Sequence, residues 1–150
     1  MRGLGRAVVV LLMLAFAISA CTSSKPRASR TPSISDEVTL RTDSQTYAPG
    51  GRPKITLVNG SDSEVGYNLC FAFLELERLD GGTWKKVSKS LGPGGNVDCT
   101  AELRLLAPGA MATGQPYLPS DLEPGTYRLV HKAEINRERT EVATNAFEVS

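Results

Sequence analysis

The sequence predicts an all-β fold, an antiparallel β-sandwich that begins near residue 37. From Glu37 onward no stretch shows the 3.6-residue apolar period of an amphipathic helix. Short runs rich in β-branched and aromatic residues alternate instead with clusters of Gly, Pro, Asn and Asp. These runs number roughly seven to eight, which is the number and spacing of strands typical of a single sandwich domain.

The first 20 residues differ in character from the rest of the chain. Arg2 and Arg6 precede an apolar run, Ala7 to Ala20, that ends in small residues. This order is that of a secretory signal peptide with its cleavage site. The run of 14 residues is too short for a spanning helix, which needs about 20 apolar residues, so a core cysteine behind a membrane helix is the weaker interpretation.

The tetrapeptide Ile18-Ser19-Ala20-Cys21 resembles the lipobox of bacterial lipoproteins. The resemblance implies cleavage between Ala20 and Cys21, a diacylglyceryl group on the Cys21 thiol and acylation of the new amino terminus. It therefore implies a protein held on the extracytoplasmic side of a bacterial cell membrane through Cys21. A single acyl chain holds a protein only marginally, whereas the two chains of a diacylglyceryl group suffice for stable attachment. A plain secretory signal is the alternative.

Residues 21–36 are expected to form a disordered tether behind the lipidated Cys21. Apart from two prolines the segment after Cys21 contains only two apolar residues, so burial cannot offset the entropy of ordering it. Removal of residues 1–20 takes away two arginines and leaves 15 basic against 16 acidic residues. A near-neutral chain without a basic patch gives no reason to expect binding to nucleic acid.

The first strands are separated by recognisable turns. Val38–Arg41 alternates apolar and polar residues, and the Pro-Gly-Gly sequence within Tyr47–Gly51 predicts a turn. Lys54–Val58 is the next strand, and Asn59-Gly60 closes it with a strong turn dipeptide.

A long strand is expected over Gly66–Arg78. Its apolar positions change from odd to even numbers part of the way along, as one inserted residue would cause. The change predicts a β-bulge near Ala72–Leu74. Asp80-Gly81-Gly82 then predicts a tight hairpin into the strand Thr83–Val87.

The second half of the domain contains more irregular chain. Two Gly- and Pro-containing stretches predict loops, and the polar stretch before the last strand predicts a hairpin connection. The expected loops are Ser88–Asp98, Gly114–Asp121 and Glu134–Val142, and the expected strands are Glu102–Leu106, Thr126–Lys132 and Asn145–Val149.

Two turns resemble those of bacterial immunoglobulin-like domains: Tyr-x-Pro-Gly at Tyr47–Gly50 and Leu-x-Pro-Gly-x-Tyr at Leu122–Tyr127. The resemblance implies an immunoglobulin-like β-sandwich over residues 37–150, in which Tyr127 bonds its hydroxyl to nearby backbone as a tyrosine corner. Antibody-type domains have a cysteine two residues after that tyrosine. This chain has Leu129 there, so their inter-sheet disulfide is not implied. The resemblance implies a fold and no reaction.

The chain has three cysteines. If Cys21 carries lipid, Cys70 and Cys99 remain as a pair in an oxidising compartment, which predicts a disulfide between them. The bond is expected to pin the loop Ser88–Asp98, whose few apolar side chains cannot hold it by burial. Two separate buried thiols are the alternative. Two cysteines and the distant His131 fall short of a zinc site, and no cofactor is expected.

Several residues could carry chemistry, and each has a simpler interpretation. Glu75 and Glu77 share one strand face at a spacing that suits glycosidase carboxylates, but both are expected to face water. His131 lacks any motif that supplies a nucleophile and an orienting acid. The loop Asn59–Glu64 lacks the complete ligand pattern of a calcium site. Four aromatic residues form either a ligand groove or the core: Tyr67, Phe71, Phe73 and Trp84.

The sequence therefore predicts a non-catalytic, lipid-anchored binding or accessory module of the bacterial envelope, with another envelope protein as its partner. The end loops Ser88–Asp98 and Gly114–Asp121 are the expected contact surface. Three alternatives remain open: a protease inhibitor that presents Leu118–Ser120, a small envelope enzyme, and a structural part of a larger complex.

Overall fold

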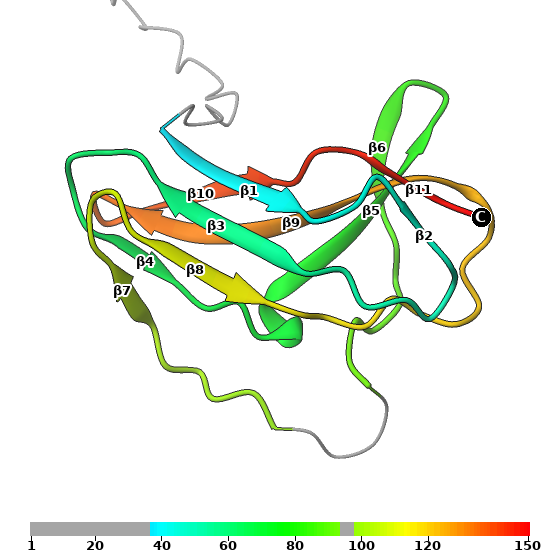
Figure 1. The fold of residues 1–150 in the computed structure, drawn as a ribbon, viewed down its shortest axis with the longest axis horizontal. Coiled ribbons are helices and arrows are strands. Elements are labelled where there is room, and N and C mark those ends of the chain that lie inside the picture. The colour runs from blue at the N-terminus through cyan, green and yellow to red at the C-terminus, as the bar shows by residue number, and fades with distance from the viewer. Residues whose placement is uncertain (1–36, 94–97) are drawn as a thin grey trace, which may run out of the picture.

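A computed structural model describes residues 37–93 and 98–150, and these form an all-β structure of two sheets, most of whose strands pair antiparallel (Figure 1). The predicted signal peptide, the lipidation site Cys21 and the predicted tether lie outside the described residues. In the part of the chain that the structure describes, no helix is long and apolar enough to cross a membrane.

The smaller sheet has three antiparallel strands in the order β1 (Val38–Thr42), β3 (Ile55–Asn59) and β8 (Met111–Gly114). Strict alternation places the buried residues of β1 and β3 on one face: Val38, Leu40, Ile55, Leu57 and Asn59. That face is buried because it covers the larger sheet, while the opposite face meets solvent.

The larger sheet is built around the longest strand, β9. Its main path runs β2-β11-β9-β4-β7, and β10, β5 and β6 attach beside that path. All its strand pairs are antiparallel except β2 with β11. The strands are β2 (Thr46–Tyr47), β4 (Val65–Tyr67), β5 (Leu74–Asp80), β6 (Thr83–Lys86), β7 (Arg104–Leu106), β9 (Gly125–Ile135), β10 (Glu138–Ala143) and β11 (Phe147–Val149).

One hydrophobic core lies between the two sheets. Both sheets contribute to it, as do four residues of the connecting segments, Leu69, Leu91, Leu118 and Leu122. Burial of the large apolar side chains supplies most of the free energy that holds the sheets together, on the order of 1.5–3 kcal/mol for each fully buried side chain. The largest fully buried apolar residues are Ile55, Leu57, Leu76, Tyr127, Leu129 and Phe147.

The long strand expected over Gly66–Arg78 is interrupted, so the predicted bulge is wrong in kind but right in place. β4 ends at Tyr67, a 3-10 helix, η1 (Phe71–Phe73), follows, and β5 begins at Leu74. The apolar positions change parity because the chain leaves the sheet for one helical turn and returns with the alternation shifted.

Three strands of the structure were not predicted from the sequence. The stretch Glu134–Val142, expected to be a connection, contains most of β10, which pairs with β9 across a tight turn at Asn136 and Arg137. Both turn residues have positive φ, 52° and 64°, as the two central residues of a type I′ hairpin require. β2 and β8 were also not expected.

The loop Ser88–Asp98 is not held by the disulfide alone, contrary to expectation. Leu91 is 3% exposed and packs in the core. Its carbonyl accepts a hydrogen bond of 2.9 Å from the amide of Tyr117. Local burial therefore anchors the first half of this loop, and residues 94–97 lie outside the described chain.

Tyr127 makes the hydrogen bond that its position predicts. Its buried ring packs beside Phe147, and its hydroxyl donates to the carbonyl of Glu123 at 2.8 Å. Tyr127→Phe should therefore lower the free energy of unfolding by about 1–2 kcal/mol, because the carbonyl loses its partner. Urea unfolding of the full chain measures this. Tyr117→Phe is the matched control, because no hydrogen bond of its hydroxyl is found among the described residues; equal effects of the two substitutions would contradict the prediction.

Candidate binding groove

An opening in the larger sheet follows from the interruption between β4 and β5. Both strands pair with the same edge of β9: β5 as far as His131, and β4 from Glu134 onward. No strand of the described chain pairs with that edge at residues 132–133. The 3-10 helix η1 carries the chain past this gap instead of filling it.

A groove of about 440 Å³ lies over the gap. Phe73 of η1 and Leu103, just before β7, contribute large apolar side chains that are 40% and 47% exposed. Leu103 packs over Gly66 of β4, where an added Cβ would come within 2.8 Å of Leu103 Cδ2 and would displace the leucine side chain. The groove is lined by Asn68, Ala72, Phe73, Glu75, Ala101, Leu103, His131, Lys132, Glu134 and Arg139.

The disulfide ties together the two chain segments that carry these apolar residues. Cys70 directly precedes η1, and Cys99 begins the segment that leads to Leu103. Their Cα atoms are 5.8 Å apart, which confirms the predicted pairing. The bond fixes the distance between the two sides of the groove without occupying it.

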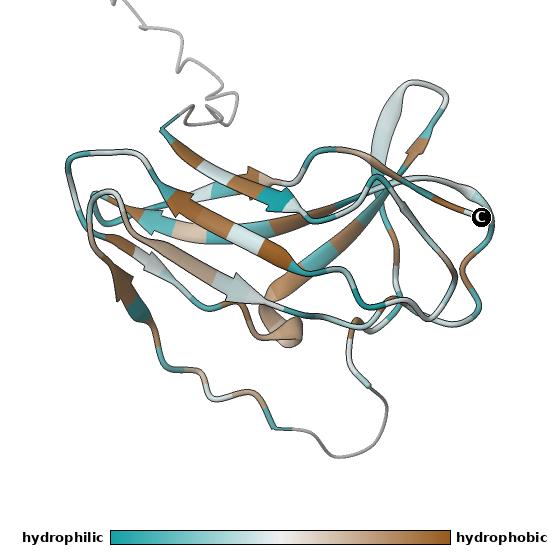
Figure 2. Ribbon diagram, viewed as in Figure 1, coloured by the Kyte–Doolittle hydropathy of each residue, from teal (hydrophilic) through white to brown (hydrophobic). Residues whose placement is uncertain are grey.

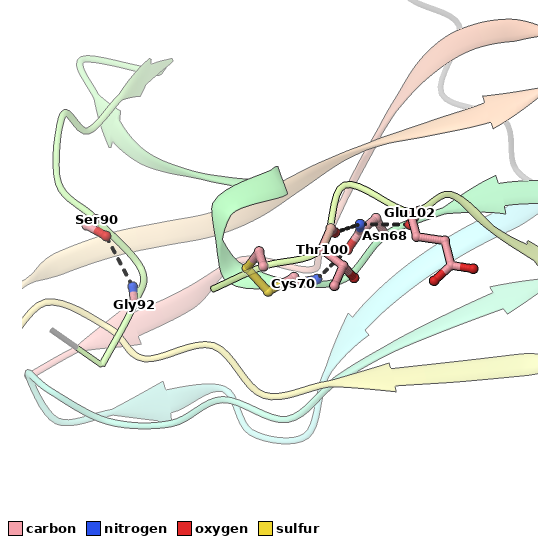
Figure 3. Close-up of a disulfide and its surroundings, with 7 residues drawn as sticks. Asn68, Cys70, Ser90, Gly92, Thr100 and Glu102 are labelled. Atoms are coloured by element: carbon pink, nitrogen blue, oxygen red, sulfur yellow. Dashed lines mark hydrogen bonds between the residues drawn. A yellow bond between two sulfur atoms is a disulfide. The ribbon is translucent and has the colours of Figure 1, made fainter. Parts of the chain in front are cut away.

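Asn68 reinforces this link (Figure 3). Its side-chain nitrogen donates to the carbonyls of Thr100 and Glu102 at 2.8 and 2.9 Å, and its side-chain oxygen accepts from the amide of Cys70 at 3.0 Å. One side chain thus bonds the backbone on both sides of the disulfide. The groove is therefore preformed, and little conformational entropy is lost in ordering it when a ligand binds.

Two charged groups at the rim, Glu75 and Lys132, form ion pairs. Glu75 accepts hydrogen bonds from Lys86 and from Lys132, both at 3.0 Å, and the bond from Lys86 is the largest cause of a lowered Glu75 pKa. Glu77 pairs with Arg128 at 2.6 Å. A glycosidase acid needs a raised carboxyl pKa, so Glu75 is unsuited to that role.

His131 lies at the floor of the groove and is 2% exposed. Its Nδ1 is 3.4 Å from the carbonyl of Phe73, and its Nε2 has no hydrogen-bond partner within the described residues. Burial lowers the pKa of the imidazole below its usual 6.5, with the Phe73 carbonyl opposing the shift. The ring is therefore neutral at pH 7.

The remaining candidates are structural. Asn59 is fully buried; its amide donates to the carbonyls of Ser63 and Leu106 and accepts from Ser61, so it is not free to bind calcium. No group of three or more His, Cys, Asp or Glu side chains suited to a metal ion is present in residues 37–93 and 98–150.

The four aromatic residues divide between the two interpretations. Phe73 lines the groove, whereas Tyr67 and Phe71 pack against the core. Trp84 does neither. It lies on the outer face of the sheet, where the Arg128 guanidinium stacks 4.4 Å from its ring centre.

The two end loops expected to make contacts do lie together. Lys89 bonds the carboxylate and the carbonyl of Asp121 at 2.9 and 2.8 Å, and a shallow hollow of about 490 Å³ lies between the loops. Their large apolar residue Leu118 faces inward and is buried, with its amide bonded to the Gly51 carbonyl. The apolar residue of the segment expected to wedge into a protease is thus part of the core, while Ser120 is exposed.

The groove itself was not found from the sequence. Leu103 and Leu105 alternate with charged residues as any half-buried strand does, and nothing in that pattern shows which of them meet solvent. No protein-family model matches this sequence, and comparison with curated protein sequences finds no match. The site therefore rests on its geometry.

The buried His131 predicts a loss of stability in mild acid. Below about pH 6.5 His131 binds a proton in the unfolded chain but stays unprotonated in the folded chain, because its folded pKa is lowered. The free energy of unfolding therefore falls as the pH drops from 7 through 6.5 towards the folded pKa. Urea unfolding at pH 7.5 and 5.5 measures this. His131→Leu should remove the difference, because His131 is the only histidine. An equal acid effect in both proteins would refute this role.

Proposed function

We propose that the protein is a lipid-anchored binding module on the extracytoplasmic side of a bacterial membrane, and that it recognises another protein of the envelope through the groove. The observation that carries the proposal is the pair of exposed apolar side chains, Phe73 and Leu103, on chain segments held by a disulfide. Large apolar groups at a rigid, concave surface are typical of sites that take a partner's apolar side chain.

The proposed location rests on the N-terminal sequence. Ile18-Ser-Ala-Cys21 resembles a lipobox, and the disulfide between Cys70 and Cys99 is consistent with an oxidising compartment. Cys21 is the proposed lipid-bearing residue, and residues 21–36 are the proposed tether that lets the domain reach its partner.

The proposed fold family is immunoglobulin-like. With β1, β3 and β8 taken as strands A, B and E, and with β4–β5, β9 and β10–β11 taken as C, F and G, the strands divide between two sheets as in immunoglobulin domains. The hydroxyl bond from Tyr127 to the chain upstream supports the same assignment. Domains of this kind commonly serve as binding modules, which agrees with the function proposed.

A binding role is favoured over catalysis by the state of the groove's ionisable groups. Glu75 is held ionised by two lysines, and His131 is buried and neutral. These groups fix the sheet around the groove rather than exchange protons with a ligand. The inhibitor alternative is not favoured, because Leu118 is buried and its backbone is bonded.

Cys21→Ser should abolish lipid attachment and release the protein from membranes. The expected result is a shift of the protein from the detergent phase to the aqueous phase in phase partitioning, together with loss of the lipid mass. The Cys70–Cys99 peptide should remain linked in both proteins, which controls for folding. Retention in the detergent phase with normal processing would exclude the proposed anchor.

A photo-crosslinking residue in place of Ala101 should capture the partner in intact cells, because Ala101 lines the groove. The same residue at Thr83, in the exposed β5–β6 hairpin, is the control. One dominant protein adduct from position 101, reduced by Phe73→Ser and absent from position 83, is expected. Equal labelling from both positions, or an adduct that Phe73→Ser does not reduce, would reject the groove as the binding site.

A further inference from the structure

The strand β7 forms an open edge of the larger sheet. It is the last strand of the path β2-β11-β9-β4-β7 and, among the described strands, it pairs only with β4. Figure 2 shows hydrophobic residues on this strand at the outer end of the sheet. Leu105 in its middle is 63% exposed. Charges or bulges usually protect an edge strand, whereas exposed apolar residues make it a template for another strand.

The bonds of Asn68 show which backbone groups are free. They engage the carbonyls of Thr100 and Glu102, which therefore face β4. Backbone groups alternate in direction along an extended chain, so those of the odd-numbered residues face away from β4. The groups available to another strand are thus those of Ala101, Leu103 and Leu105.

We propose that the strand added at this edge is that of a second copy of the chain, antiparallel and in a register centred on Leu103. Leu103 then faces Leu103 of the second copy, and Ala101 faces Leu105 of the second copy. Every free backbone group of these three residues gains a partner. The interface is two-fold symmetric, so one segment supplies both sides of it.

Charge complementarity favours this register over its neighbours. It places Glu102 opposite Arg104 of the second copy, and the two-fold repeats that pair. Neither side chain has an ion-pair or hydrogen-bond partner within the described part of the chain. In this register the two residues form non-hydrogen-bonded pairs, the positions at which side chains of paired strands lie closest.

In the proposed dimer, the groove of each copy also makes an apolar contact with the other copy. Leu105 of the second copy lies opposite Ala101, which lines the groove together with Leu103 and Phe73. The exposed leucine of each copy thus meets the exposed apolar wall of the other. The inference goes beyond the proposed function, because it places a second copy of the chain at the β7 edge beside the groove. The proposed lipid anchor would aid this pairing by raising the effective concentration of copies on one surface.

Cysteine crosslinking tests the register. Leu103→Cys should give a disulfide-linked dimer under mild oxidation, because directly opposed residues in a hydrogen-bonded antiparallel pair have Cα atoms about 5.5 Å apart. Leu105→Cys is the matched control on the same strand. Its two copies would be separated by about 13 Å along the strands and should stay monomeric. Met111→Cys, 69% exposed on the other sheet, controls for random collision.

Crosslinking of each full-length cysteine variant is measured in membranes. It is measured again in solution at high protein concentration, with Cys21→Ser added to the same variants. Peptide mapping should identify the 103–103 link with Cys70–Cys99 intact. Crosslinking in either setting supports the dimer. Absence of crosslinking both in membranes and in solution overturns the dimer. It does not bear on the proposed lipid anchor, because the partitioning of Cys21→Ser is measured separately. Equal crosslinking through positions 103, 105 and 111 also overturns it.

Charge reversal tests the register through the two ion pairs that the register predicts. Glu102→Arg in the Leu103→Cys protein should lower the crosslinked fraction about tenfold, because two opposite-charge pairs become two like-charge pairs. Arg104→Glu should do the same. The double substitution Glu102→Arg with Arg104→Glu should restore crosslinking. Failure of the double substitution to restore it, with both single variants folded, excludes the register.

Discussion

The pairing of β9 with four other strands is the constraint on which the rest of the structure depends. β11 and β10 follow one another along one edge of β9, and β5 and β4 follow one another along the other. An eleven-residue strand can accept two short strands on each edge only if the chain leaves the sheet between them. The departure of η1 between β4 and β5 creates the groove, and the disulfide stabilises that departure.

The parts of the fold that could be predicted are those with a local cause. Turn residues located most strand ends, and the shift in apolar parity located the interruption at Phe71–Phe73. β10 was missed because only Val142 among its residues is buried, so that the strand resembles a polar loop. Its conformation is imposed by pairing with β9, a non-local interaction that propensity does not record.

The candidate site was predictable only through its cysteines. An even pair of thiols indicates a disulfide, but it does not indicate which side chains that disulfide brings together. Leu103 is partly exposed and Leu91 is buried in the core. The sequence around each is typical of exposed chain, since Leu91 precedes a glycine and Leu103 lies between two charged residues. The difference arises because Leu91 lies against the loop that contains Tyr117, whereas 47% of Leu103 stays exposed in the part of the chain that the structure describes.

The exposed leucines are costly unless something covers them. Substitution of Leu105 by a charged residue would protect the edge of β7 in the way that edge strands are usually protected. The chain instead keeps Leu103 and Leu105 at this edge and separates them by Arg104. In the proposed antiparallel pair, Arg104 faces the oppositely charged Glu102 of the second copy. A short strand of three residues gives few hydrogen bonds, so such an edge pairs weakly in solution and does so best where copies are confined together. The effects of the proposed membrane anchor and of the proposed self-complementary edge would therefore reinforce each other.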